Sequence, residues 1–342
     1  MPHARRPVLG LFLALSTRTA FIAVAMIAIA FVSADAGGTT DIAKIDLTQW
    51  KPPDIEQING DAFGRLVQYG HALFTTTANQ IGPTVADPAR RYAGNNLDCQ
   101  SCHLKAGTQP YAMPLAGVWG QFPQYRAREG EVGTLEDRIN GCLARSMNGR
   151  TLPLASREMK AYLAFMRWLS TGVPDGAKLT GAGTLAIKEP GRAADLDRGK
   201  QIYARVCTTC HGPDGGGQRA ATGAGYQYPP LWGPDSFNDA AGMGRLLKAA
   251  AFIKNNMPFG TTFAAPELSD DDAYDVAGFV ISQQRPHKAD LAKDYPNRLQ
   301  KPVDTPYGPY ADGFNPIQHK LGPFGPIRTK LKELAAQSDP RH

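Results

Sequence analysis

The chain has 342 residues, which is room for about two domains of ordinary size. It contains 36 glycines and 27 prolines, so regular helices must share the chain with long loops. The net charge of +6 includes no clustered Lys/Arg tract, which excludes nucleic acid as a partner and suits small anions or an acidic protein instead.

Residues 1–36 are predicted to be an export signal. Arg5 and Arg6 supply the positive start, residues 20–32 are almost wholly apolar, and Ala34-Asp35-Ala36 offers small residues for cleavage. The alternative is an uncleaved membrane anchor, for which this apolar run is short unless an earlier apolar stretch extends it. In both cases we expect the rest of the chain to lie outside the cytoplasm, in a bacterial periplasm.

Residues 37–58 are polar, contain prolines and are interpreted as a lead-in. A first domain is predicted over residues 59–173. Its opening helix is indicated by apolar or small residues at a helical period, namely Phe63, Leu66, Val67, Gly70, Leu73 and Phe74. Its closing helix is indicated in the same way by Met159, Tyr162, Leu163, Met166 and Leu169.

Between these two helices stands Cys99-Gln-Ser-Cys102-His103. Two cysteines separated by two residues and followed at once by histidine are the signature of covalent haem c attachment. Cys99 and Cys102 form thioethers with the porphyrin, and His103 becomes the proximal iron ligand. The alternatives are a dithiol redox motif and half a zinc site, and the adjacent histidine disfavours both.

A second domain, predicted over residues 193–285, repeats this plan. Cys207-Thr-Thr-Cys210-His211 attaches a second haem c, with Cys207 and Cys210 as thioether residues and His211 as proximal ligand. Gly199 echoes Gly70, and each supplies a small residue where two helices approach closely. Ser269 and the acidic residues after it begin a capped closing helix. The predicted fold is all-α, with two class I cytochrome c-like domains around two covalently bound haem c groups.

Two further segments carry no haem motif. Residues 174–192, rich in Gly, Pro, Thr, Ala and Lys, are predicted to be a linker. Residues 286–342 contain nine prolines with interleaved tyrosines and phenylalanines. This composition predicts an extended Pro-rich C-terminal tail that packs on the domains.

Each haem iron has one more axial position, whose occupant sets the reduction potential. In the second domain Met257 lies 47 residues after Cys210, in a loop before the closing helix, and is the expected ligand. Met243 is the competitor, and a helix expected over 242–253 favours a core position for it.

The first haem offers two candidates for the same position. Met147 lies 45 residues after Cys102, and Cys142 lies 40 residues after it. A helix is expected over 134–147, and five residues on a helix turn by about 500°, so the two side chains point about 140° apart. Spacing alone leaves both interpretations open: a ligating Met147 beside an inert Cys142, or a Cys142 thiolate on the iron.

The run from Thr134 to Arg150, Thr-Leu-Glu-Asp-Arg-Ile-Asn-Gly-Cys-Leu-Ala-Arg-Ser-Met-Asn-Gly-Arg, resembles the dihaem thiosulfate dehydrogenases, tetrathionate-forming c-type cytochromes related to SoxA-type cytochromes. The tail run Pro306-Tyr-Gly-Pro-Tyr-Ala-Asp312 resembles that family as well. The resemblance implies that Cys142 is the distal ligand of the catalytic haem and Met257 that of the electron-exit haem. Some members have a lysine before this methionine that exchanges with it on the iron. Asn256 stands there in this chain, so a lysine exchange is not expected.

The resemblance also implies an oxidoreductase that joins two thiosulfates into tetrathionate, in a direction the sequence does not fix. Electrons would pass to the second haem and then to a soluble acceptor, such as a small cytochrome c or a high-potential iron-sulfur protein. An anionic substrate needs positive charge, and arginines surround Cys142 in sequence, namely Arg126, Arg128, Arg138, Arg145 and Arg150. Arg138 and Arg145 share a helical face with Cys142, and with Arg128 they are the candidate substrate-binding residues. The alternative is that these arginines pair with nearby acids, namely Glu129, Glu131, Glu136 and Asp137.

Other functions remain open from the residues. A non-enzymatic dihaem electron carrier would have Met147 on the first iron. A SoxA-like subunit of a sulfur-oxidation complex would act only with a carrier protein. A dihaem peroxidase has no support here beyond the presence of two haem motifs.

Overall fold

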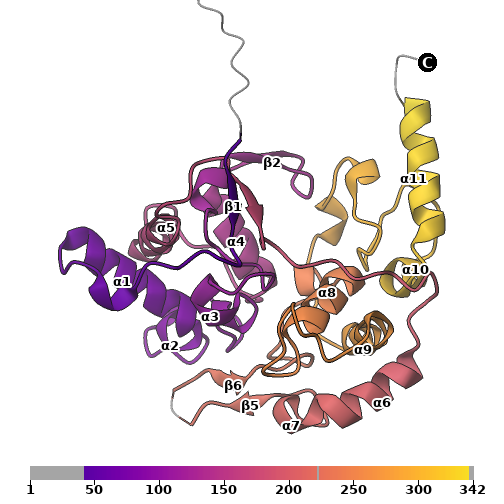
Figure 1. The fold of residues 1–342 in the computed structure, drawn as a ribbon, viewed down its shortest axis with the longest axis horizontal. Helices are drawn as coiled ribbons and strands as arrows, with labels where there is room; N and C mark the ends of the chain where they lie inside the picture. The colour runs from indigo at the N-terminus through magenta and orange to yellow at the C-terminus, as the bar shows by residue number, and fades with distance from the viewer. Residues whose placement is uncertain (1–41, 222, 339–342) are drawn as a thin grey trace, which may run out of the picture. The chain divides into compact units, whose positions relative to one another are not determined.

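The computed structural model describes residues 42–221 and 223–338, and the chain from Ile42 onward forms one compact unit. The predicted export signal lies outside the described residues. In chain order, the α-helices of the first domain are α1 (Ala62–Thr75), α2 (Thr77–Ile81), α3 (Leu104–Gly107), α4 (Leu135–Arg145) and α5 (Arg157–Leu169). They are followed by α6 (Leu196–Val206), α7 (Thr208–His211), α8 (Leu246–Asn256) and α9 (Asp270–Ser282) in the second domain (Figure 1). Within the described part of the chain, none of the helices is both long and apolar enough to cross a membrane.

Helices α1 and α5 enclose the core of the first domain. Asp61 caps α1 by accepting a hydrogen bond from the Gly64 N–H at 2.7 Å, and Ser156 caps α5. The two helices cross at Gly70, where a Cβ would overlap the carbonyl oxygen of Ala161. The predicted opening and closing helices are therefore confirmed, and so is the reason for the glycine between them.

The second domain repeats this crossing with α6 and α9. A Cβ at Gly199 would overlap the carbonyl oxygen of Asp275 on α9, so Gly199 has the role of Gly70. Ser269 and Asp272 form the capping box expected at the start of α9. Helix α8 packs along α9 and leads directly into Met257. The all-α prediction of two cytochrome c-like domains is confirmed.

The strands are short and occur in pairs. Strand β1 (Lys44–Asp46) pairs in parallel with β4 (Lys178–Thr180), Ile45 opposite Leu179. The antiparallel pairs are β2 (Gln124–Arg126) with β3 (Glu131–Gly133), and β5 (Gln218–Arg219) with β6 (Tyr226–Tyr228). The first pair joins the lead-in to the linker, a long-range contact that neither segment's composition indicated.

The Pro-rich tail lies on both domains, and its final part is helical. It has no strand or α-helix up to Phe314 and then forms α10 (Pro316–Leu321) and α11 (Gly325–Ser338). Phe324 and Ile327 are buried in the core of the second domain. The buried Asp304 accepts a hydrogen bond from the Leu247 N–H, so the tail supplies a carboxylate to the N-terminus of α8.

Candidate haem centres

The proximal histidine of the first domain is fixed by the loop after its haem motif. His103 Nδ1 lies 2.6 Å from the carbonyl oxygen of Met113, and burial lowers the pKa of His103 to about 4. The ring is therefore neutral, with its proton on Nδ1 and Nε2 available to an iron. Met113 has a left-handed backbone, with φ of 54°, which aims its carbonyl at the ring at a cost of about 1 kcal/mol or more.

The second domain fixes its proximal histidine in the same way. His211 Nδ1 lies 2.8 Å from the carbonyl oxygen of Pro229, and burial lowers the pKa of His211 as well. The loops at Met113 and Pro229 therefore share one task. Each orients one ring for one axial bond.

The motif cysteines lie in dry surroundings. Burial raises the pKa of the Cys99 thiol to about 11, that of Cys102 to about 12 and that of Cys207 to about 11. A dithiol redox motif requires a lowered thiol pKa, so these environments disfavour that alternative and suit conversion to thioethers. The residues present fit a haem c in each domain.

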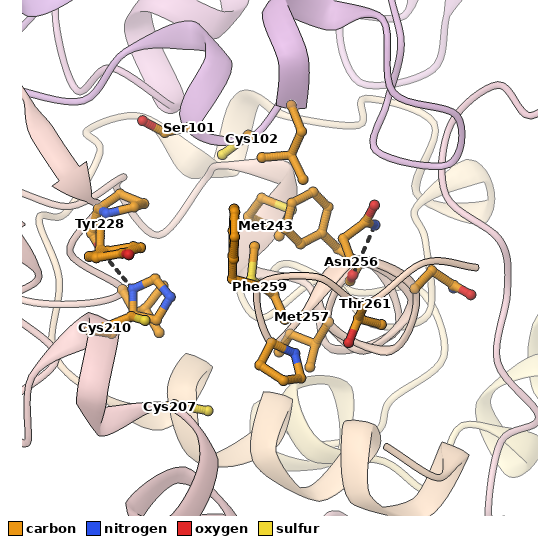
Figure 2. Close-up of a pocket in the computed structure, with 18 of the residues that line it drawn as sticks. Ser101, Cys102, Cys207, Cys210, Tyr228, Met243, Asn256, Met257, Phe259 and Thr261 are labelled. Carbon is orange, nitrogen blue, oxygen red and sulfur yellow. Dashed lines mark hydrogen bonds between the residues drawn. The ribbon is translucent and has the colours of Figure 1, made fainter. Parts of the chain in front are cut away.

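A cavity of about 740 Å³ opens beside the second motif. Cys207, Cys210, His211 and Met257 all line it, so the attachment residues and the expected distal ligand face one space (Figure 2). Met243 lines the same cavity from a 3-10 helix, because α8 begins only at Leu246. The helix expected over 242–253 is thus divided into a 3-10 turn (Gly242–Gly244) and α8, and Met243 is partly buried against the core cluster of the first domain. Which of the two methionines is the ligand stays a prediction.

The cavity of the second domain also reaches the first haem motif. Ser101 and Cys102 line its wall opposite the second motif (Figure 2). The first motif therefore borders the cavity beside the second motif, a proximity that electron transfer between two haems would require.

Helix α4 carries a thiol and a guanidinium toward the first motif. Arg138 Nη1 donates a hydrogen bond to Cys142 Sγ at 2.9 Å. Burial is the main cause of the raised pKa of the Cys99 and Cys102 thiols, and the nearby Cys142 raises it further. Burial is also the main cause of the lowered pKa of His103, and the nearby Arg138 lowers it further. These electrostatic influences place Cys142 and Arg138 within range of the haem-binding residues.

Helix α4 is fixed at both ends, and one of its anchors comes from the other domain. Thr134 and Asp137 form a capping box at its start. At its end the carbonyl oxygens of Ala144 and Arg145 accept hydrogen bonds from Asn238 Nδ2 and the Asn238 N–H. Asn238 belongs to the second domain, and no local sequence signal reveals this cap.

The other two candidate arginines are engaged with the tail. Arg145 Nη2 lies 2.6 Å from Asp294 Oδ1, and Glu129 lies 3.9 Å from the same guanidinium. Arg128 donates to the Tyr295 hydroxyl at 3.2 Å and to the carbonyl oxygen of Ala240 at 3.0 Å. Of the three candidates, Arg138 is the one that the structure brings to Cys142. Pairing of arginines with neighbouring acids, the alternative interpretation, holds for Arg145 and for Arg126 with Glu129.

Met147 is a core residue of the first domain. Its exposure is 3 %, and it packs among Leu143, Leu152 and other apolar side chains. Met147 lies two residues beyond the end of α4. Cys142, in contrast, lies within the helix and is half-buried.

Family models and related proteins agree with this arrangement. The family model described as "SoxA/TsdA, cytochrome c domain" matches residues 90–174, and the model described as "Cytochrome c" matches residues 196–284. The fold and its two motifs thus define a c-type cytochrome with two cytochrome c domains that bind haem c.

Curated relatives narrow the family further. The chain is 41 % identical over 237 residues to a thiosulfate dehydrogenase of Stutzerimonas stutzeri, covering 69 % of this chain and 73 % of that protein. It is 38 % identical over 270 residues to one of Psychrobacter arcticus, covering 78 % and 77 %. A thiosulfate dehydrogenase (TsdBA) structure from Marichromatium purpuratum matches with a TM-score of 0.64 and 32 % identity, covering 71 % of this chain and 51 % of that one. The chain belongs to the thiosulfate dehydrogenase family.

Proposed function

We propose that this protein is a periplasmic dihaem enzyme that oxidises two thiosulfates to tetrathionate and releases two electrons. Its first haem would be held by Cys99, Cys102 and His103 with Cys142 as distal ligand. Its second haem would be held by Cys207, Cys210 and His211 with Met257 as distal ligand. Each haem iron accepts one electron, so two haems together can take up the two electrons that the reaction releases.

The observation that carries this proposal is the contact between Arg138 and Cys142 on α4. A guanidinium has five N–H donors in a planar fork, and one of them is directed at the sulfur. The remaining donors are suited to the oxygens of a thiosulfate whose outer sulfur approaches Cys142. Arg138 is exposed, and no carboxylate lies within ion-pair distance of it among residues 42–221 and 223–338.

The sulfur chemistry follows thiolate–disulfide exchange. The Cys142 thiolate and the outer sulfur of one thiosulfate form an S–S bond, and two electrons leave in that oxidation. The outer sulfur of a second thiosulfate then attacks the thiosulfate-derived sulfur of this adduct. That attack breaks the bond to Cys142, regenerates its thiolate and releases tetrathionate, so two thiosulfates give one tetrathionate and two electrons.

The test is thiosulfate-dependent reduction of ferricyanide by the purified dihaem protein, with tetrathionate measured as product. Cys142→Gly, checked to retain both haems, should lose at least about 1,000-fold in turnover because it removes the attacking sulfur. Equal turnover in the two proteins would exclude Cys142 from catalysis. Absence of activity in both, with matching haem spectra, would identify an electron carrier, whereas activity only with an added carrier protein would identify a SoxA-like subunit.

A further inference from the structure

The loop that presents Met257 has little support of its own. It runs from Met257 to Thr262, between α8 and Phe263, and its internal bond joins the Thr261 N–H to the carbonyl oxygen of Pro258 at 3.0 Å. Phe259 is 89 % exposed. The position of the Met257 sulfur must therefore be set by what holds the two ends of this loop.

The first end is held through Asn256, which lies beside Met257 at the cavity wall (Figure 2). Its side chain is buried, with 4 % exposure for the residue. Gln109 Nε2 donates to Asn256 Oδ1 at 2.7 Å, and Asn256 Nδ2 donates to the carbonyl oxygen of Tyr111 at 3.3 Å. Both partners belong to the first domain.

The far end of the loop is held by the same segment of the first domain. The rings of Tyr111 and Phe263 pack edge to face, with centroids 4.9 Å apart and planes at 63°. This geometry is a favourable one for aromatic pairs. Residues 109–111 thus contact both ends of the loop.

That segment is itself rigid. The Tyr111 N–H donates to the carbonyl oxygen of Gly181 and the Met113 N–H to that of Gly183, each at 2.7 Å. Tyr111 and Met113 both have left-handed backbones, which persist only where the surroundings enforce them. The carbonyl of Met113 is the one that orients His103. One short segment therefore reaches the proximal side of the first haem site and the distal side of the second.

We propose that Gln109 and Tyr111 are positioning residues for the distal ligand of the second haem. By fixing Asn256 and Phe263 they hold Met257 against the iron and slow its departure. The inference rests on the proposed ligation by Met257. It assigns to the first domain a part in setting the axial bond, and hence the potential, of the haem in the other domain.

Competition with imidazole measures how firmly Met257 is held. Imidazole added to the ferric full-length dihaem protein replaces a methionine ligand and removes the methionine–iron charge-transfer band of that haem. Gln109→Leu should tighten imidazole binding about tenfold, equivalent to about 1.4 kcal/mol, because the bound loop then loses one hydrogen bond to a buried amide. Phe263→Ala should act in the same direction, and it changes a half-buried loop residue outside both domain cores.

Gln121→Leu is the matched control. Gln121 Nε2 donates to the carbonyl oxygen of Ala177, a bond of similar type that involves neither the Met257 loop nor residues 109–111, so imidazole binding should stay unchanged. Unchanged binding in Gln109→Leu and Phe263→Ala, with the band still lost in Met257→Leu, would overturn the positioning role and leave the ligand assignment intact. A band that survives Met257→Leu would instead overturn the assignment of the ligand itself.

Discussion

The two haem domains are alike on their proximal sides and differ on their distal sides. In both domains a glycine permits the helix crossing, a motif histidine follows the two cysteines, and a backbone carbonyl orients the imidazole. The candidate distal ligand of the second domain is Met257, which directly follows α8 and lines an apolar cavity. The candidate distal ligand of the first domain is Cys142, which lies within α4 beside the exposed guanidinium of Arg138.

Under the proposed function, this difference lets one scaffold support two tasks. A thioether in a loop favours a haem of higher potential that passes electrons on. A thiol within a helix, with a cation one turn away, creates a place where a sulfur anion can bind and react. The two domains differ in the candidate distal ligand and the residues around it, whereas the helix crossing and the loop that orients the histidine are the same in both.

The largest effect is expected when the methionines of the second domain are replaced by leucine, one at a time. Met257→Leu should abolish the methionine–iron charge-transfer band and lower the potential of that haem, because leucine cannot ligate iron. Met243→Leu is the control, since Met243 lines the same cavity, and it should keep the band. Visible and near-infrared spectra measure the charge-transfer band, and a redox titration measures the potential of the second haem. The reverse outcome would make Met243 the ligand.

A smaller effect is expected from the cation of the first domain. Arg138→Met should lower kcat/KM for thiosulfate about 10- to 100-fold, the value of one charge-assisted hydrogen bond. Arg205→Met removes an exposed arginine from α6 and should leave kcat/KM unchanged. Steady-state kinetics at fixed ionic strength measure both. Equal losses in the two variants would mean that only overall charge matters.

The smallest effect is expected from Met147. If Cys142 is the distal ligand, Met147→Leu is a swap of similar volume in a packed core and should cost less than about 1.5 kcal/mol of stability. The spectrum and potential of the first haem should not move. Thermal unfolding and a redox titration check both statements. A changed first-haem spectrum would favour Met147 on the iron and the electron-carrier interpretation.

What could be predicted from the sequence was local in the chain. The haem motifs, the cap at Ser269 and the glycines at helix crossings depend on residues that are close together or on a repeated pattern. The start of α8 at Leu246 differs from the expected start at Gly242, because the carboxylate at its N-terminus comes from Asp304 far along the chain and not from a local capping residue.

The rest could not be predicted because it depends on contacts between distant segments. Asn238 caps α4 from 94 residues away in sequence, and Asp294 reaches Arg145 from 149 residues away. In the sequence, Asn238 and Asp294 are polar residues in segments without a helical pattern. A single sequence does not show which partner each of them contacts. Only the fold brings Gln109 to Asn256.

The tail contact with Arg145 has a consequence for how the protein is made. Chains are synthesised from the N-terminus, and domains generally fold as they emerge. Arg145 lies on α4, the helix that carries Cys142, yet its carboxylate partner Asp294 is translated 149 residues later. Until then α4 holds a half-buried guanidinium without that partner. The ion pair between Arg145 and Asp294 can therefore form only after the tail has been made and has packed against the first domain.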